Sequence, residues 1–271
     1  MNRVWLTLGA ALLAVACQTT GTEPPAPPTQ PDGLDPGVVT RVNDGDSGLV
    51  EVRGSVLEFR LEGMNAPEHD ECHGEESSNR LAALVEGVTV GIELTGTDQF
   101  DRNLAYVWLD DALVNLELVS GGDAVATTPG EGETWGDSLI AAENDAASGG
   151  RGLWSESACG GTGPVPDIAV DPLSSRFDPD GPDEEVLEEE WVTFDYEETL
   201  DVGGWTIRDE SSAHRCVIAD GTLISADRPL TVTSADQCWD PGDTPVWNNA
   251  GDLVLLLDHL GRVAARHRYT R

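Results

Sequence analysis

The chain has 271 residues, and its 50 Asp and Glu against 15 Lys and Arg give a formal net charge of −35 at pH 7. All fifteen basic residues are Arg. This balance excludes a surface that attracts polyanions by net charge. Eight Trp and 39% hydrophobic residues exclude wholesale disorder, and the length predicts one or two domains.

Residues 1–16 have the features of an export signal. Arg3 is followed by an apolar run of about thirteen residues, too short for a comfortable membrane span. The end of this run, Leu13 to Cys17, resembles a bacterial lipobox, which implies cleavage before Cys17 and lipidation of its thiol. Ordinary cleavage nearby and a buried N-terminal helix are the less favoured alternatives. We expect an exported lipoprotein held at a bacterial membrane, at the outer membrane or cell surface.

Two folded segments are expected after this signal. Residues 17–37 are Pro-rich and form a predicted tether. The folded segments are 38–159 and 167–271, and residues 160–166, rich in Gly and Pro, link them.

The first segment is predicted to be a small barrel of mixed α and β content. Alternating apolar residues and turn signals predict strands at 38–42, 49–52, 57–61, 88–94 and 104–109. Helical spacing predicts helices at 76–85, 113–119 and 139–147. Asp137 and Ser138 are available as N-caps of the last helix.

The second segment is predicted to be nearly all β. Apolar runs predict strands at 190–194, 205–208, 230–233 and 253–257. Turn signals about every ten residues favour a β-sandwich.

Polar side chains that suit phosphate chemistry lie in three short segments of the first half: 44–47, 60–68 and 101–107. Their hard oxygen ligands and two Arg residues, Arg60 and Arg102, suit a divalent cation and a phosphate group. Phosphodiester cleavage needs a carboxylate for water and guanidinium donors for the charge that gathers at phosphorus. Each of these segments alone is more often a turn, an ion pair or a surface carboxylate, so only their combination indicates phosphate chemistry.

The order and spacing of these motifs resemble the staphylococcal nuclease (thermonuclease) family over about residues 38–159. The motifs that carry the resemblance are Val39–Asp46, Phe59–Glu68, Asp101–Val107, Leu113–Asn115, Ala142–Glu143 and Gly152–Trp154. The resemblance implies an OB-fold barrel with helices and Ca²⁺-dependent hydrolysis of DNA and RNA.

The resemblance also assigns roles to individual residues. Arg60 and Arg102 would contact the phosphate in the transition state, and Glu68 would position or activate water. Asp46 would be the main Ca²⁺ carboxylate, helped by the Asn65 side chain and the Ala66 backbone carbonyl.

Three positions depart from the family pattern. Asn65 replaces the second Ca²⁺ carboxylate, so we expect weaker Ca²⁺ binding. Phe100 lies in Gln-Phe-Asp where the family has Lys-Tyr-Gly, and its ring can stack on a base for about 1–3 kcal/mol. Thr127 and Thr128 replace an aromatic expected near the nucleotide. Because all three catalytic side chains are present, activity is favoured over an inactive fold.

The cysteines indicate disulfides in an exported protein. Without Cys17, four remain, and pairing within each half is favoured among three connectivities. A zinc site at Cys72, His73 and Cys159 lacks a close Cys pair and is disfavoured. The positions of Cys72 and Cys159 resemble those of secreted nucleases in which the two are bridged.

The second segment resembles the lamin tail domain, an immunoglobulin-like sandwich found on many exported proteins. The matching stretches are Leu187–Phe194, Gly203–Glu210 and Val246–Asp252. The resemblance implies binding or tethering of an unspecified ligand. Core positions are expected for Trp191, Trp205 and Trp247, and a disulfide for Cys216 and Cys238; residues 178–185 are expected to be a solvated acidic loop.

Two hypotheses of function remain. The first is a lipid-anchored, Ca²⁺-dependent nuclease that acts on DNA, RNA or both and carries an accessory β-sandwich. The alternative is a noncatalytic surface lipoprotein that uses its β modules for adhesion or polymer binding. The neutral Asn65 and the repulsive net charge support the alternative.

Overall fold

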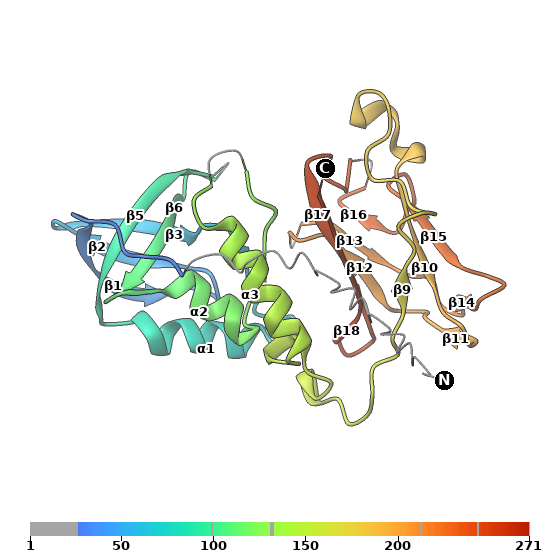
Figure 1. Cartoon of the computed structure of the whole chain (residues 1–271), viewed down its shortest axis with the longest axis horizontal. Coiled ribbons are helices and arrows are strands. Elements are labelled where there is room, and N and C mark those ends of the chain that lie inside the picture. Colours follow the sequence, from blue (N-terminus) through green and yellow to red (C-terminus); the bar gives the residue numbers. More distant parts are fainter. Residues whose placement is uncertain (1–26, 99, 131–132, 212, 243, 271) are drawn as a thin grey trace, which may run out of the picture.

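The computed structural model describes residues 27–98, 100–130, 133–211, 213–242 and 244–270. The expected signal, Cys17 and the first part of the tether therefore lie outside the described residues. Elements β1 to β8 and α1 to α3 form a first module, and β9 to β18 form a second (Figure 1). Within the described residues, no helix is long and apolar enough to cross a membrane.

A closed five-stranded barrel forms the body of the first module. Its strands are β1 (Asp35–Val42), β2 (Ser47–Val52), β3 (Ser55–Leu61), β5 (Thr89–Thr97) and β6 (Asn103–Leu109). The order is β3-β2-β1-β5-β6, and a parallel pairing of β3 with β6 closes the barrel. Alternate side chains such as Val39, Val50 and Phe59 fill the core. The expected mainly β content is confirmed, and the barrel is consistent with an OB-fold.

Three helices pack on this barrel and three short strands complete the module. The helices are α1 (Gly74–Val85), α2 (Val114–Gly121) and α3 (Gly136–Ser148). The short strands are β4 (Met64–Asn65), β7 (Ala112–Leu113) and β8 (Val125–Ala126), and the chain continues into 3₁₀ turns at Gly152–Trp154 and Ala158–Gly160.

Two local expectations for the first module differ from the structure. Helix α3 begins at Gly136 after Trp135, with no side-chain cap, so Asp137 and Ser138 lie inside the helix and the predicted caps were wrong. Strand β1 begins at Asp35, three residues before the expected start of the folded segment. Leu34 packs against the barrel core, so the end of the predicted tether belongs to the fold.

The second module consists of antiparallel sheets around a separate apolar core. One sheet has the order β16-β13-β12-β17-β18, another has β15-β10-β9, and β11 pairs with β14. The bounds are β9 (Ala169–Val170), β10 (Trp191–Asp195), β11 (Leu200–Asp201), β12 (Thr206–Arg208), β13 (Arg215–Val217), β14 (Leu223–Ile224), β15 (Leu230–Thr233), β16 (Trp239–Asp240), β17 (Gly251–Leu257) and β18 (Val263–Thr270), with 3₁₀ turns at Asp183–Glu185 and Leu187–Glu189. The immunoglobulin-like and lamin tail assignments remain predictions.

One expected core tryptophan is not in the core. Trp205 and Trp247 are buried as expected. Trp191 is only half-buried, because its indole N–H donates to the Ser174 carbonyl and its ring lies beside the Arg176 guanidinium. Trp239 is buried instead, edge-on to Trp247.

Both disulfides favoured by the sequence are present, which confirms pairing within halves. Cys72 bonds to Cys159, and Cys216 bonds to Cys238. The first bridge consumes both thiols of the disfavoured zinc site. His73 contacts Asp123 instead, with Nε2 3.0 Å from a carboxylate oxygen.

The two modules meet in a shared apolar cluster. Val125 and Leu153 of the first module pack with Leu253 and Leu255 of β17. Beside this cluster, the fully buried Glu143 of α3 pairs with arginines of β18. The linker therefore joins modules that are packed on each other.

Candidate active site

The floor of the site is formed by a buried carboxylate, Asp46, in the turn between β1 and β2. One oxygen of Asp46 accepts the backbone N–H of Ala66 at 2.8 Å and lies 2.7 Å from the Arg60 guanidinium. Gly45 is required here, because an added Cβ would lie 2.0 Å from Ser77 Oγ of α1 and 2.6 Å from Ala66 Cβ. The expected Asp-Gly-Asp turn thus packs directly against the following helix.

The Arg60 guanidinium connects this turn to strand β4. One nitrogen contacts Asp46 and the Met64 carbonyl, and the other donates to Asn65 Oδ1 at 2.6 Å. Register places Arg60 beside Leu104 of β6 and Asn65 beside Val125 of β8. The barrel strands therefore bring together four residues that the sequence had assigned to one site: Asp46, Arg60, Asn65 and Ala66.

Burial controls the protonation of this cluster. It raises the pKa of Asp46 to about 7, and the Asp44 carboxylate acts in the same direction, while the Arg60 charge opposes both. A single guanidinium therefore only partly compensates the buried Asp46 charge. Additional positive charge beside Asp46 would stabilise the carboxylate form.

The donor set around Asp46 suits a hard cation. It comprises the Asp46 carboxylate and the Asn65 amide oxygen, which both contact the Arg60 guanidinium, together with the Ala66 carbonyl that the family resemblance assigns. All three are oxygen donors. Asn65 Nδ2 is buried and has no hydrogen-bond partner among the described residues, so a substrate or solvent oxygen would satisfy it. No cluster of three or more His, Cys, Asp or Glu side chains suited to a metal occurs in the described ranges. These residues fit a cation that takes its remaining ligands from water and substrate.

Arg102 lies at the start of β6, next to the strand that carries Arg60. Its Nε is 2.7 Å from Asp98 Oδ2, and Asp98 also accepts the backbone N–H groups of Phe100 and Arg102. Partial desolvation raises the pKa of Asp98, but these hydrogen bonds outweigh it and hold the pKa below its usual range. The Phe100 side chain is 69% exposed, and its ring centroid lies 5.5 Å from the Arg102 guanidinium carbon. Both groups are accessible to a substrate.

Glu68 lies on the loop between β4 and α1 and is exposed. Its backbone N–H donates to Glu71 Oε2 at 2.6 Å, and its carbonyl accepts the Glu71 N–H at 2.9 Å. Gly74 begins α1 against this turn, because a Cβ there would lie 1.9 Å from the Glu68 carbonyl oxygen. The loop that carries Glu68 is therefore fixed by its own backbone and by α1.

The structure adds charged residues to which the sequence had assigned no contact or role. Their common feature is that they cross between the modules: Arg208, Arg215, Arg266, Arg268, Glu71, Glu143 and Glu210. The sequence did offer one sign of these contacts. Four of the fifteen Arg lie in residues 262–271 of an otherwise acidic chain, a concentration that suggests carboxylate partners elsewhere in the fold.

The replacement of an aromatic by Thr127 and Thr128 has a structural consequence at this junction. The Thr128 backbone N–H and hydroxyl both donate to Glu210 of the second module at 2.8 to 2.9 Å. Arg268 also contacts Glu210 and Glu143. Thr128 thus serves module packing.

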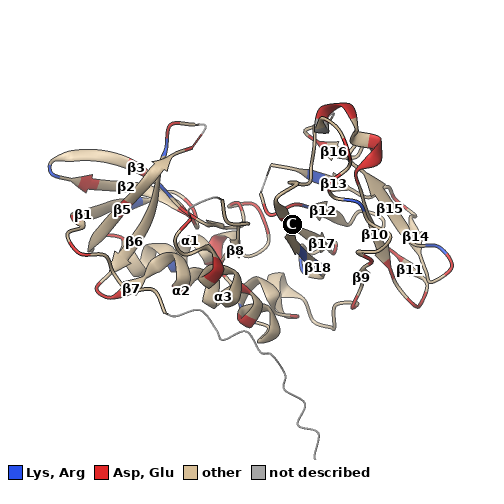
Figure 2. Cartoon of the chain, turned by 45° about the horizontal axis from the view of Figure 1, so that its top comes forward, with Lys and Arg blue, Asp and Glu red and all other residues tan. Residues whose placement is uncertain are grey.

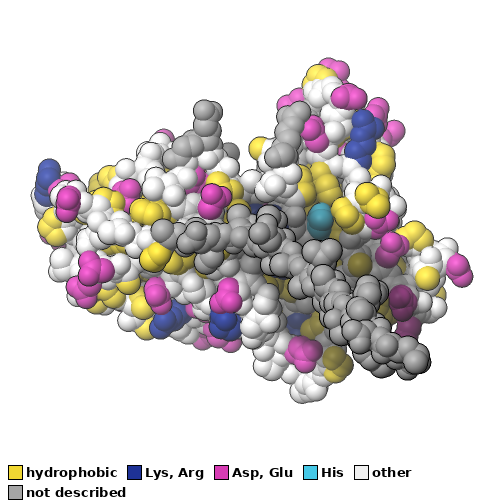
Figure 3. All heavy atoms as spheres, viewed as in Figure 1, with side chains coloured by type: hydrophobic (Ala, Val, Ile, Leu, Met, Phe, Trp, Pro, Cys, Tyr) yellow, Lys and Arg dark blue, Asp and Glu magenta, His cyan; other side chains and the backbone are white. Residues whose placement is uncertain are grey.

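Acidic side chains are distributed over both modules. Figure 2 shows Asp and Glu along the ribbon of each, with few Arg segments between them. The face seen in Figure 3 likewise carries scattered acidic side chains over both modules. Long-range attraction of a polyanion by net charge is thus excluded for the folded protein too.

Comparison with known proteins identifies the first module. The family of staphylococcal nuclease homologues matches residues 58–156. An uncharacterized endonuclease of Escherichia coli O157:H7 is 32% identical over 121 residues, covering 44% of this chain and 77% of that protein. An uncharacterized endonuclease of Haemophilus influenzae is 29% identical over 119 residues, which span 44% of this chain and 65% of that protein. A thermonuclease of Staphylococcus intermedius is 32% identical over 97 residues, covering 33% of this chain and 58% of its own.

Proposed function

Because the chain belongs to the staphylococcal nuclease family, we propose that it is a nuclease that hydrolyses phosphodiester bonds in DNA, RNA or both. The observation that supports this most strongly is the cluster of Asp46, Arg60 and Asn65. Arg102 immediately precedes the neighbouring strand β6, and Glu68 lies on the loop after β4.

In the proposed reaction a water oxygen attacks phosphorus as the bond from phosphorus to the leaving oxygen breaks. Glu68 orients this water and accepts its proton. Arg60 and Arg102 donate hydrogen bonds to the nonbridging oxygens, where negative charge increases in the transition state. Phe100 provides a face for stacking with a base.

We also propose that the reaction depends on Ca²⁺ held by Asp46, Asn65 and the Ala66 carbonyl. When bound, the ion would supply positive charge next to a nonbridging phosphate oxygen. The partly compensated Asp46 carboxylate and the all-oxygen donor set support this proposal. Because Asn65 is neutral, the affinity for Ca²⁺ is expected to be low.

The Asn65→Asp variant tests the contribution of that neutral ligand. We expect it to bind Ca²⁺ about tenfold more tightly, because a second carboxylate adds charge at the same position. Calorimetric titration of the protein with Ca²⁺ measures the affinity directly. Thr95→Val, at an exposed position of β5, is a control that should leave the affinity unchanged. Equal affinities of wild type and Asn65→Asp would contradict the ligand assignment.

Salt provides a second test, because the acidic surface repels a nucleic acid substrate. The Debye length falls from about 8 Å at 0.15 M to about 3 Å at 1 M salt. We therefore expect DNA cleavage at fixed Ca²⁺ to hold or rise as NaCl increases, unlike a basic nuclease that binds through counterion release. Initial rates from 0.02 to 0.5 M NaCl check this. A steep fall in kcat/KM between low and moderate salt would refute it.

We propose in addition that the protein is exported and anchored to a membrane through lipid on Cys17, supported by the lipobox-like sequence. The second module would then act as a lamin tail domain that binds an unidentified surface ligand. Labelling with a fatty acid in cells that express wild type or Cys17→Ala tests the anchor. Incorporation of label into wild type alone is the expected result.

Assays of purified protein on DNA and on RNA test the activity. We expect wild type to cleave in millimolar Ca²⁺ and Glu68→Gln to be nearly inactive. Folded wild-type protein that cleaves neither substrate would instead favour the noncatalytic surface lipoprotein.

A further inference from the structure

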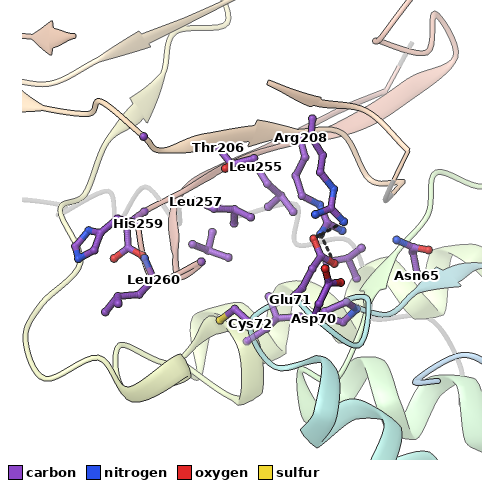
Figure 4. Close-up of a pocket in the computed structure, with 18 residues that line it drawn as sticks. Asn65, Asp70, Glu71, Cys72, Thr206, Arg208, Leu255, Leu257, His259 and Leu260 are labelled. Carbon is purple, nitrogen blue, oxygen red and sulfur yellow. Dashed lines mark hydrogen bonds and ion pairs between the residues drawn. The ribbon is translucent and has the colours of Figure 1, made fainter. Parts of the chain in front are cut away.

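A single carboxylate links the catalytic loop to the second module. One oxygen of Glu71, Oε2, accepts the backbone N–H of Glu68 at 2.6 Å. The other, Oε1, lies 3.0 Å from the Arg208 guanidinium and 2.7 Å from that of Arg215, and Arg208 also donates to Oε2 at 3.2 Å. Figure 4 shows Glu71 and Arg208 pointing toward each other from opposite sides of the junction.

The two arginines come from adjacent strands of the second module. Arg208 ends β12 and Arg215 begins β13, and the two residues are paired in register. Both lie outside the matched nuclease segment 58–156. Only the folded second module therefore places them next to Glu71.

Because this ion pair is buried, losing one of its partners is costly. The Arg208 side chain is 6% exposed and that of Glu71 is 12% exposed. A buried carboxylate with two guanidinium partners is well compensated, while loss of one partner leaves charge in a poorly solvated place. The second module thus restrains the Glu71 carboxylate, and this carboxylate in turn restrains the Glu68 backbone.

Two further contacts hold the same loop. The Cys72–Cys159 disulfide fixes the residue that follows Glu71. The turn between β17 and β18 packs closely against Cys72. Gly261 lies at this contact, where an added Cβ would be only 2.6 Å from Cys72 Cβ. A cavity of about 280 Å³ separates these contacts and extends to Asn65 of the candidate site.

We propose that the second module is a working part of the nuclease, in which Arg208 and Arg215 act through Glu71 as positioning residues for Glu68. This inference rests on the proposed function. Glu68 is exposed on a loop, and its action on water requires a fixed backbone, since a displacement of about 1 Å can cost about a hundredfold in rate. In this assignment the two arginines contact neither the substrate nor the attacking water.

The test compares arginine variants of the full chain by steady-state kinetics on an oligonucleotide in saturating Ca²⁺. Arg215→Gln is expected to lower kcat about tenfold or more and to leave KM within about twofold, because ground-state binding does not involve Glu68. Arg215→Lys, which keeps the charge, is expected to recover most of the activity. Arg176→Gln is the matched control, since its side chain is 35% exposed against 34% for Arg215 and its ion pair with Glu189 lies within the second module.

Two measurements separate positioning from loss of folding or docking. Melting temperatures show whether each variant is folded at the assay temperature, and Arg266→Gln weakens the junction at Glu143 without touching the Glu68 loop. Amide hydrogen exchange of residues 68–74 is expected to speed up in Arg215→Gln but not in Arg266→Gln or Arg176→Gln.

The results distinguish this inference from the proposed function. If Arg215→Gln keeps the wild-type kcat and exchange rate, or if Arg266→Gln loses as much kcat, the positioning role is wrong. If wild type itself cleaves nothing, the proposed function fails and catalytic positioning fails with it. The amide exchange rates of residues 68–74 would then show only whether the second module restrains the Glu68 loop.

Discussion

The Glu68→Gln variant is expected to lose about 10²- to 10⁴-fold in kcat, the range typical for removal of a general base. Gln has nearly the shape of Glu but cannot accept the proton of the attacking water. The backbone hydrogen bonds between Glu68 and Glu71 involve no Glu68 side-chain atom, so the loop should be retained. KM should change little. Initial rates on a fluorescent oligonucleotide over a range of concentrations measure both constants.

A control for this variant is Asp70→Asn, which removes an exposed carboxylate two residues away on the same loop. It should keep kcat within about threefold of wild type, because a surface charge at this distance is screened by solvent. Wild-type kcat in Glu68→Gln would remove Glu68 from the mechanism, whatever the overall activity.

Arg102→Lys is expected to lower kcat about 10²- to 10³-fold, the cost of one preorganised transition-state donor. Lys keeps the positive charge but loses the planar fork that matches two phosphate oxygens. The side chain of Arg102 is 28% exposed, and its ion pair with Asp98 is local, so the fold should tolerate the change. The same kinetic assay and a thermal melt separate catalysis from stability.

Arg53→Lys is the matched control for loss of a guanidinium. Arg53 lies in the turn between β2 and β3, with 77% of its side chain exposed, and pairs with Asp35. Its activity should equal that of wild type. If Arg102→Lys were as active as Arg53→Lys, Arg102 would be a surface arginine and not a transition-state donor.

The first module was largely predictable from local pattern. Alternation located every end of the five barrel strands within three residues. The order of the motifs correctly predicted that Asp46, Arg60 and Asn65 lie together. The predicted caps of α3 were wrong because the helix begins at Gly136, and the N-cap position is taken by Trp135, which packs against the barrel core. Local hydrogen-bonding propensity is easily outweighed by tertiary packing.

The second module was harder to predict because charge obscured its strands. Strand β18 contains Arg266, His267 and Arg268, and β13 begins with Arg215, so neither has a continuous apolar run. These arginines lie in strands because they neutralise carboxylates of the other module, a long-range reason that no local pattern contains. The same reason explains why the link from Arg215 through Glu71 to Glu68 was not foreseen.

The structure changes the interpretation of the net charge. A charge of −35 disfavours long-range attraction of nucleic acid, but several arginines are already used inside the protein. In the proposed reaction, Arg60 and Arg102 would supply local donors to the phosphate. The acidity is therefore compatible with a nuclease of weak ground-state binding that tolerates salt.

Chelation and restoration of Ca²⁺ test the central claim most directly. The rate of DNA cleavage by full-length protein is measured in millimolar Ca²⁺, after an excess of EDTA, and again after Ca²⁺ is restored in excess of the chelator. The account predicts cleavage that EDTA abolishes and Ca²⁺ restores in wild type, with Glu68→Gln nearly inactive throughout. Cleavage that persists in EDTA, or that is equal in Glu68→Gln, would contradict it.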